Sequence, residues 1–185
     1  MWSTAAERAV QESGLAETAR AQLEQQFDRL LAENGGALSR LAAGYTNFAA
    51  DRDDLVQEIA LAIWRALPHF RGECSERTFI FRIAHNRAVT YLTRRRAQKT
   101  ETAEAFEVAD QAPGPEAGLV RNQQGAQLRR AVRSLPLLYR QVVMLMLEGM
   151  EYDEIAQVLG ISESNVGARL SRARHMLREL MEAAR

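Results

Sequence analysis

The residues that decide the fold run from Glu151 to Arg174 and read EYDEIAQVLGISESNVGARLSRAR. A short helical pattern in this stretch ends at Gly160, and glycine just past a helix end takes the left-handed conformation that closes the helix. Ser162 follows, and its hydroxyl can accept the free backbone N–H groups at the start of a second helix. A helix, a tight glycine turn and a second helix predict a helix-turn-helix, whose second helix enters the major groove of DNA.

The two faces of that second helix differ in composition. Spacings of three and four place apolar residues on one side, namely Val166, Leu170, Ala173, Leu177 and Leu180. The opposite side carries small, polar and basic residues suited to base edges and phosphates, namely Ser164, Ala168, Ser171, Arg172 and His175, with Asn165 and Arg169 on its flank. Between residues 164 and 178 there are four arginines and no acid. We interpret this side as a DNA-binding face; the alternative is an ordinary amphipathic helix with a solvated basic face.

The composition argues against several other classes of protein. Cys74 is the only cysteine in 185 residues, which excludes an internal disulfide framework and favours the reducing cytoplasm. The three histidines form no metal-ligand spacing with that cysteine, and we expect neither a metal nor a cofactor. The sequence shows no carboxylate pair, nucleophile–base set or glycine-rich phosphate loop, so an enzyme is not expected. It also shows no apolar run long enough to span a bilayer, and residues 1–20 lack the features of a signal peptide.

The net charge is zero, which is unusual for a DNA-binding protein, but the charge is segregated along the chain. Residues 71–99 hold eight basic residues and two acids, a net charge of +6. Residues 100–118 hold five acids and no base, and residues 121–185 hold ten bases and seven acids. Local fields rather than the total charge steer a partner towards a surface, so this distribution is compatible with two basic binding regions.

The hydrophobic pattern predicts an all-α protein made of two small helical domains joined by a flexible acidic linker. We expect an extension over residues 1–22, a first domain over 23–97, a linker over 98–122 and a helix-turn-helix domain over 123–185. The linker is inferred from its Ala, Glu and Gln content and from the Pro-Gly-Pro at 113–115, which prevents a continuous helix. Helices are expected at about 23–31, 37–48, 51–67, 76–97, 123–134 and 137–147, with Asn34-Gly35-Gly36 breaking the first from the second.

The expected helix at 51–67 has an acidic and partly apolar outer face. Asp54, Gln57, Glu58, Leu61 and Arg65 lie on it, with Trp64 near its border and Leu55 on the apolar side. Such a face could dock a basic partner helix. On composition alone, a solvated face is the favoured interpretation.

A second candidate binding region combines the loop at 69–75 with the helix that follows it. Ser75 is a candidate N-cap, and the polar side of the helix offers Arg82, Asn86, Arg87 and Thr90. A basic helix beside a glycine-containing loop could hold a DNA backbone and a splayed-out base. A solvated helix end fits the composition equally well.

Three stretches in this order resemble the sigma subunits of bacterial RNA polymerase, in particular the extracytoplasmic-function (ECF) group. Residues 53–65 resemble the polymerase-docking helix of that family, residues 70–73 with 82–86 resemble its promoter −10 reading loop and helix, and residues 135–177 resemble its −35 reading domain. The likeness covers about residues 23–182, most of the chain. It implies a protein that is not catalytic and that gives promoter specificity to RNA polymerase.

The resemblance assigns roles to particular residues. A coiled coil of the polymerase's largest subunit would be contacted by Asp54, Leu55, Gln57, Glu58, Leu61, Trp64 and Arg65. Single-stranded −10 DNA would be held by Arg71, Gly72, Glu73, Cys74, Ser75, Arg82, Asn86, Arg87 and Thr90. Duplex −35 DNA would be read by Ser164, Asn165, Gly167, Ala168, Arg169, Ser171, Arg172 and His175. The linker would thread near the active-site channel of the polymerase. Members of the family are often held by an anti-sigma factor, although no residue of this chain identifies one.

The sequence departs from the family pattern at several positions. Glu151 stands where Ser or Thr usually caps a helix, Gly167 where a basic residue is common, and Ala168 where Ser is common. Thr90 often corresponds to an acid, and Phe79 to Trp. We therefore transfer no −35 consensus to this chain.

Two other readings of the sequence remain open. One is a stand-alone helix-turn-helix regulator that binds duplex DNA without polymerase, and the other is an interaction protein with a degenerate helix-turn-helix. The discriminating feature is residues 53–96, because a plain repressor needs neither a docking helix nor a second basic helix.

Overall fold

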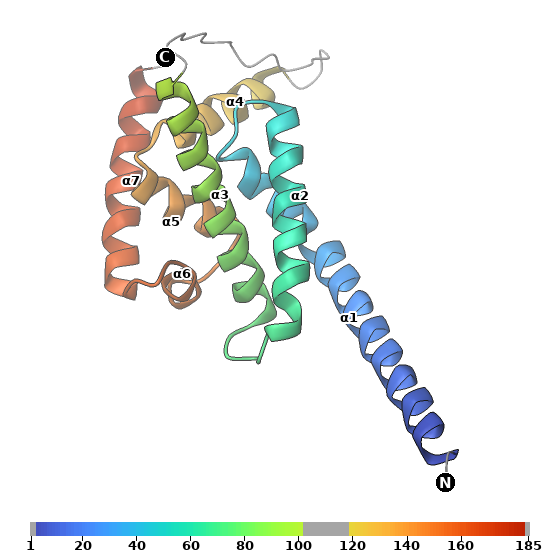
Figure 1. Ribbon diagram of the computed structural model, residues 1–185. Coiled ribbons are helices and arrows are strands. Elements are labelled where there is room, and N and C mark those ends of the chain that lie inside the picture. The colour runs from blue at the N-terminus through green and yellow to red at the C-terminus, as the bar shows by residue number, and fades with distance from the viewer. Residues whose placement is uncertain (1–2, 102–118, 184–185) are drawn as a thin grey trace.

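The computed structural model describes residues 3–101 and 119–183, whose regular secondary structure is helical, with no strand among them. The first half contains α1 (Ser3–Ala43), α2 (Ala49–Ala66), the 3₁₀ turn η1 (Leu67–His69) and α3 (Glu76–Glu101). The second half contains α4 (Leu119–Ser134), α5 (Leu137–Leu147), α6 (Tyr152–Leu159) and α7 (Glu163–Ala183). The all-α class and the two helical halves expected from the sequence are confirmed (Figure 1).

The acidic stretch expected to link the halves falls mostly on residues 102–118, which lie outside the described part of the chain. Helix α3 continues to Glu101 and α4 begins at Leu119, so both helices run into the margins of the expected linker at 98–122. Neither margin contains a proline or glycine, so nothing in the local sequence ends the helices sooner.

The expected break at Asn34-Gly35-Gly36 is wrong, because α1 is one continuous helix from Ser3 to Ala43. Asn34 is buried, and its side-chain amide donates to the Leu30 carbonyl oxygen at 3.0 Å, within the same helix. Each glycine costs about 1 kcal/mol relative to alanine in a helix. That cost is offset because the continuous helix buries Leu38 and Leu41, each worth roughly 1.5–3 kcal/mol.

The first half packs α1, α2 and α3 against one another. Its core is formed by apolar positions of all three helices, including Leu30, Leu38, Leu41, Leu55, Ile59, Ile63, Ile80, Phe81 and Ala84. The expected cap of α3 is confirmed, since the Thr78 backbone N–H donates to the Ser75 hydroxyl at 3.0 Å. Pro68 lies in η1 immediately after α2, where the expected helix was to end.

The second half places α7 against α4, α5 and α6. Gly160 has φ 65°, in the left-handed region, and the Asn165 backbone N–H donates to the Ser162 hydroxyl at 3.3 Å. The turn of the helix-turn-helix therefore forms as the sequence predicts. Glu151, which stands where Ser or Thr usually caps the helix, gains support from Glu154, whose carboxylate accepts the Glu151 backbone N–H at 2.9 Å.

The two halves lie against each other (Figure 1). Helix α3 packs on α1 and α2 on one side and on α6 on the other, so the second half is seated on the helix that carries the second candidate binding region. The N-terminal part of α1 projects away from this body. Within residues 3–101 and 119–183, no helix is both long enough and apolar enough to cross a membrane.

Candidate nucleic-acid interface

Helix α7 presents the expected polar face to solvent. Val166, Leu170 and Ala173 are buried against the rest of the domain. On the other side, the exposed residues are Ser164, Asn165, Ala168, Ser171, Arg172 and His175, whereas Arg169 and Gly167 are half-buried. The structure thus brings the predicted −35 residues onto one side of one helix, as major-groove contact requires. Their contact with DNA stays a prediction.

Two pairs of side chains on this helix contact each other in the protein alone. The Arg169 Nε donates to the Asn165 Oδ1 at 2.9 Å, one turn apart. His175 lies 3.4 Å from the Glu179 carboxylate, also one turn apart. Arg172 has no ion pair or hydrogen bond with any described residue, so its guanidinium is available to a ligand.

Gly167 lies at the edge of the α7 face that meets α6. A Cβ built at this position would be 3.5 Å from the Cε2 of Tyr152, which is ordinary van der Waals contact. Position 167 therefore faces Tyr152 of the first helix of the helix-turn-helix. With no side chain of its own, Gly167 offers DNA only its backbone.

The outer face of α2 is accessible at most of its predicted docking positions. Asp54, Gln57, Leu61 and Arg65 are exposed, and Leu61 keeps 55% of its surface. Such exposure of a leucine beside polar groups is compatible with a contact surface.

Three other predicted docking residues have partners within the first half. The Glu58 carboxylate lies 3.6 Å from Arg94 of α3. Trp64 packs edge-on against Phe27 of α1, with ring centroids 5.2 Å apart. The docking contact expected of Leu55 does not fit the structure, because Leu55 is 1% exposed and packs in the core, where its side chain cannot reach a partner. It stabilises the helix that carries the face.

The loop between η1 and α3 surrounds a hollow of about 390 Å³. Four of the predicted −10 residues line it, namely Arg71, Glu73, Cys74 and Arg82, together with His69, Phe70, Phe79 and Gln157. The Phe70 and Phe79 rings lie 4.7 Å apart at 39°, so two aromatic side chains stand beside two arginines. Gly72 has φ 74°, which only glycine adopts without strain, and Ser75 is engaged as the cap of α3.

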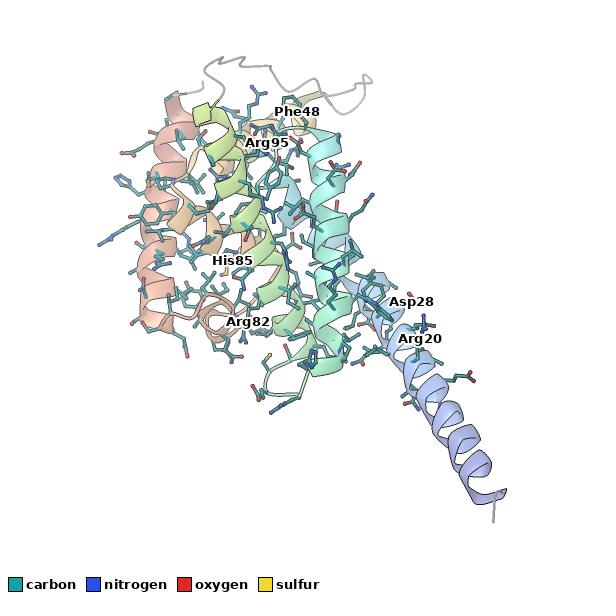
Figure 2. All side chains as sticks on the ribbon, viewed as in Figure 1. Arg20, Asp28, Phe48, Arg82, His85 and Arg95 are labelled. Atoms are coloured by element: carbon teal, nitrogen blue, oxygen red, sulfur yellow. The ribbon has the colours of Figure 1, made fainter. Side chains whose placement is uncertain are left out.

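The remaining predicted −10 residues lie further along α3. Asn86 and Thr90 line a second hollow, of about 380 Å³, between α3 and the second half, together with His85, Val89, Gln141, Val158 and Leu159. Figure 2 shows Arg82 and His85 on the side of α3 that faces α6. Arg87 is half-buried and lines neither hollow.

Sequence reasoning missed several residues of these two hollows. Gln157, Gln141, Val158 and Leu159 come from the second half, and no local pattern signals that they meet α3. Phe70 and Phe79 could have been predicted from the sequence, since they are two aromatic residues that flank a glycine-containing loop. The sequence indicated only that His85 is not part of a metal site. In the structure, burial lowers the pKa of His85 from 6.5 to about 4, and its Nδ1 lies 3.5 Å from the Tyr45 hydroxyl.

The basic end of α3 is partly neutralised by α2. Arg94 pairs with Glu58, and Arg95 pairs with Asp51 and lies over the Tyr91 ring at 5.8 Å. The hydrogen bond to Asp51 is the main cause that raises the pKa of Arg95. The arginine run at 94–96 therefore acts first as a tie between two helices, at least for the two side chains that the structure describes.

Each half of the chain matches a known protein family. The family described as Sigma-70 region 2 matches residues 30–98, and the family described as Sigma-70, region 4 matches residues 125–177. The chain belongs to the sigma-70 family. It is 34% identical over 166 residues to the RNA polymerase sigma factor CnrH of Cupriavidus metallidurans, covering 85% of this chain and 87% of that one.

Other similar proteins place the sigma factor in the ECF group. It is 30% identical over 139 residues to the ECF RNA polymerase sigma-E factor of Escherichia coli, covering 70% of this chain and 73% of the relative. The solved structure of CnrH in complex with the cytosolic domain of CnrY has a TM-score of 0.64 and 29% identity, covering 88% of this chain and 94% of that chain. The ECF resemblance of the sequence is thereby confirmed.

Proposed function

We propose that this ECF sigma factor divides promoter recognition between two exposed faces, with α7 reading duplex −35 DNA and the η1–α3 loop and α3 holding single-stranded −10 DNA. The observation that carries the proposal is the segregation on α7, where Val166, Leu170 and Ala173 are buried and Asn165 and Arg172 on the other side are exposed. Membership of the sigma-70 family makes promoter-directed initiation by RNA polymerase the activity that these faces serve.

On α7, charge and shape suit the major groove. Arg172 is exposed and without an internal partner, and a guanidinium can bind a guanine at O6 and N7 with two hydrogen bonds. Arg169 is held by Asn165, which fixes its direction along the helix and lowers the entropy lost when it meets a phosphate or base. Ser164 and Ser171 are exposed beside them and can donate to phosphates.

At the η1–α3 loop, the chemistry suits an unstacked base. Phe70 and Phe79 offer aromatic surface, and stacking on such rings is worth about 1–3 kcal/mol per base. Arg71 and Arg82 line the same hollow and supply positive charge for the backbone. A volume of about 390 Å³ lies within the range of small-molecule sites and can receive a flipped base.

On α2, we propose that the exposed face docks on the polymerase. Asp54, Gln57, Leu61 and Arg65 combine charge with an exposed apolar centre, the arrangement expected of an interface. The contact would be made with a coiled coil of the largest subunit, as the family resemblance implies. A protein that works with the polymerase acts in the cytoplasm, contributes no catalysis and adds specificity to the enzyme.

We also propose that an anti-sigma factor holds this protein. The similar CnrH has been solved in complex with the cytosolic domain of CnrY, and 29% identity over most of both chains supports a comparable partner here.

Run-off transcription tests the proposal directly. Purified core polymerase is mixed with this protein and with fragments of the source genome, and defined transcripts are expected only when both proteins are present. A stand-alone regulator would instead protect duplex DNA equally well without core polymerase and would yield no transcript. That second outcome would replace the proposed function by the regulator that the sequence left open.

A further inference from the structure

A cluster of three polar side chains ties α1 to the first residue of α3. Gln26 Nε2 donates to Glu76 Oε1 at 2.7 Å, and Arg29 Nη2 donates to both carboxylate oxygens of Glu76, at 3.0 and 2.9 Å. The hydrogen bond from Gln26, followed by that from Arg29, lowers the pKa of Glu76 and favours its ionised form. None of the three residues belongs to a predicted binding face, and Glu76 lies 50 and 47 positions along the chain from its partners.

The exposure of this cluster limits what it contributes to stability. The side chain of Arg29 keeps 48% of its surface and that of Glu76 keeps 31%. An exposed ion pair adds little to the free energy of unfolding, because water competes for both charges. A contact through two oxygens nevertheless fixes the direction of the groups that it joins. The cluster therefore affects local geometry more than global stability.

Glu76 stands directly after the η1–α3 loop, residues 70–75. The last loop residue, Ser75, accepts the Thr78 backbone N–H at 3.0 Å through its hydroxyl and donates to the Thr78 hydroxyl at 2.8 Å. The Ser75 carbonyl accepts the Phe79 backbone N–H at 2.9 Å. A tie at Glu76 thus fixes the end of the loop together with Phe79, one of the two rings of the candidate −10 hollow.

The same turn of α1 also supports the other side of the loop. Phe27, next to Gln26, packs edge-on against Trp64 in the last turn of α2, with ring centroids 5.2 Å apart. Residues 71–73, between the two supported sides, are exposed. The shape of the hollow therefore depends on how firmly α1 holds the helix ends on either side of the loop.

We propose that Gln26 and Arg29 are positioning residues for the −10 site, which act through Glu76 to hold the η1–α3 loop in the geometry that receives an unstacked base. The inference rests on the proposed −10 role of this hollow. Loop conformations that cannot receive a base lower the apparent affinity in proportion to their population. A loop that is ordered before DNA binds avoids this loss.

The mobility of the loop is measured first, without DNA. Cys74 is the single cysteine of the chain and lies in the loop, so a nitroxide attached to it in the full chain reports on this segment. Arg29→Gln and Glu76→Gln should each give a more mobile electron paramagnetic resonance spectrum. Glu33→Gln is the matched control, because it removes the other acidic neighbour of Arg29, at 3.6 Å, and leaves Glu76 in place.

Binding is then measured with unlabelled protein and a fluorescein-labelled pool of single-stranded oligonucleotides of random sequence. If the competent fraction of loop conformations falls to about one fifth, Arg29→Gln and Glu76→Gln should each weaken binding about fivefold. The double variant should lose no more than either single variant, because both changes break the same contact. A duplex pool, proposed to bind α7, should bind all of these variants equally.

The sign of the Glu76→Gln effect separates positioning from charge. Removal of a carboxylate near DNA strengthens binding if only attraction to the phosphates matters, whereas loss of positioning weakens it. Thermal melting by circular dichroism checks that each variant is folded. Gln26→Ala, which leaves the ion pair in place and removes one hydrogen bond to Glu76, replaces any variant that is not.

Three results would overturn the positioning role. Unchanged mobility in the folded variants would show that the cluster does not hold the loop. Tighter binding by Glu76→Gln would assign its effect to charge. Greater mobility with unchanged single-stranded affinity would show that loop order does not contribute to binding. In that last case Phe70→Ala separates the two proposals: a loss of binding retains the −10 hollow without a positioning cluster, and no loss removes the −10 role of the hollow itself.

Discussion

The Arg169 guanidinium is held by Asn165 one turn earlier on α7, through a 2.9 Å hydrogen bond from Nε to Oδ1. The neighbouring Arg172 has no such tie to any described residue. Two arginines on one helix face thus differ in freedom. In the proposed −35 contact, Arg169 would be set in place before binding, and Arg172 would be free to adjust to a base.

Arg172→Ala should relax preference at one position of the −35 element. The loss of a two-point contact to guanine is worth roughly 1–3 kcal/mol of discrimination. Arg178→Ala, at an exposed position further along α7, should weaken all sequences about equally and flatten the salt dependence. The measurement is binding of both variants to single-substituted −35 duplexes at two salt concentrations. Uniform weakening by Arg172→Ala, with base preferences intact, would assign specificity to Asn165, Ser171 or DNA shape.

Asp54→Arg combined with Glu58→Arg should abolish binding to core polymerase while leaving helicity unchanged. Both side chains lie on the outer side of α2, and reversal of their charges opposes a basic partner. Co-purification with core polymerase and far-UV circular dichroism are the readouts. Glu58 also pairs with Arg94, so Asp54→Arg alone must show most of the effect. Asp28→Arg, at an exposed position of α1 outside residues 53–65, is the control; undiminished co-purification of the double variant would reject the docking role.

Asn86→Ala should weaken binding to a −10 non-template oligonucleotide and slow open-complex formation. The amide can read the edge of an unstacked base, and loss of one such contact is worth about 1 kcal/mol or more. Open-complex formation is followed by permanganate reactivity of the melted strand. Equal loss of binding to duplex −35 DNA would indicate general misfolding and remove Asn86 from the −10 site.

Gly167→Ala should stabilise the protein. The added Cβ meets Tyr152 at 3.5 Å, an ordinary contact, and alanine is favoured over glycine in a helix by about 1 kcal/mol. Urea unfolding should therefore give a free energy higher by about 0.5–1 kcal/mol. Gly35→Ala, where nothing lies within 4 Å of an added Cβ inside α1, provides the comparison and should show a similar gain. A loss of stability in Gly167→Ala alone would mean that α6 does not tolerate the added methyl group.

His85 should make stability fall as the pH is lowered through weakly acidic values. Burial lowers its pKa from 6.5 to about 4. Between these pH values the unfolded chain binds the proton and the folded chain does not. The free energy of unfolding therefore decreases as the pH falls from about 6.5 towards about 4. Between pH of about 7.5 and about 5 the loss is roughly 2 kcal/mol. Urea unfolding of the wild type and of His85→Gln measures it; parallel pH curves would reject a neutral buried histidine.

The sequence by itself determined the local features of this protein. Gly160 takes φ 65° because it closes α6, the helix directly before it. Ser162 and Ser75 cap the helices that begin beside them. The apolar positions Val166 and Leu170 predicted the buried side of α7 from their spacing alone. These signals can be read from a sequence because the atoms that interact are within one or two turns of each other.

Only the tertiary structure decided how far the helices run and what they cover. Residues 34–36 contain two glycines and an asparagine, yet α1 continues through them, because burial of Leu38 and Leu41 outweighs their helix propensity. Leu55 was expected at a docking face and lies in the core, since the first half closes around it. Arg40 and Glu148 meet across 108 residues, and no local pattern specifies such a pair. The Arg40–Glu148 pair forms only when α1, α3 and α5 pack together, and that packing depends on the whole folded chain.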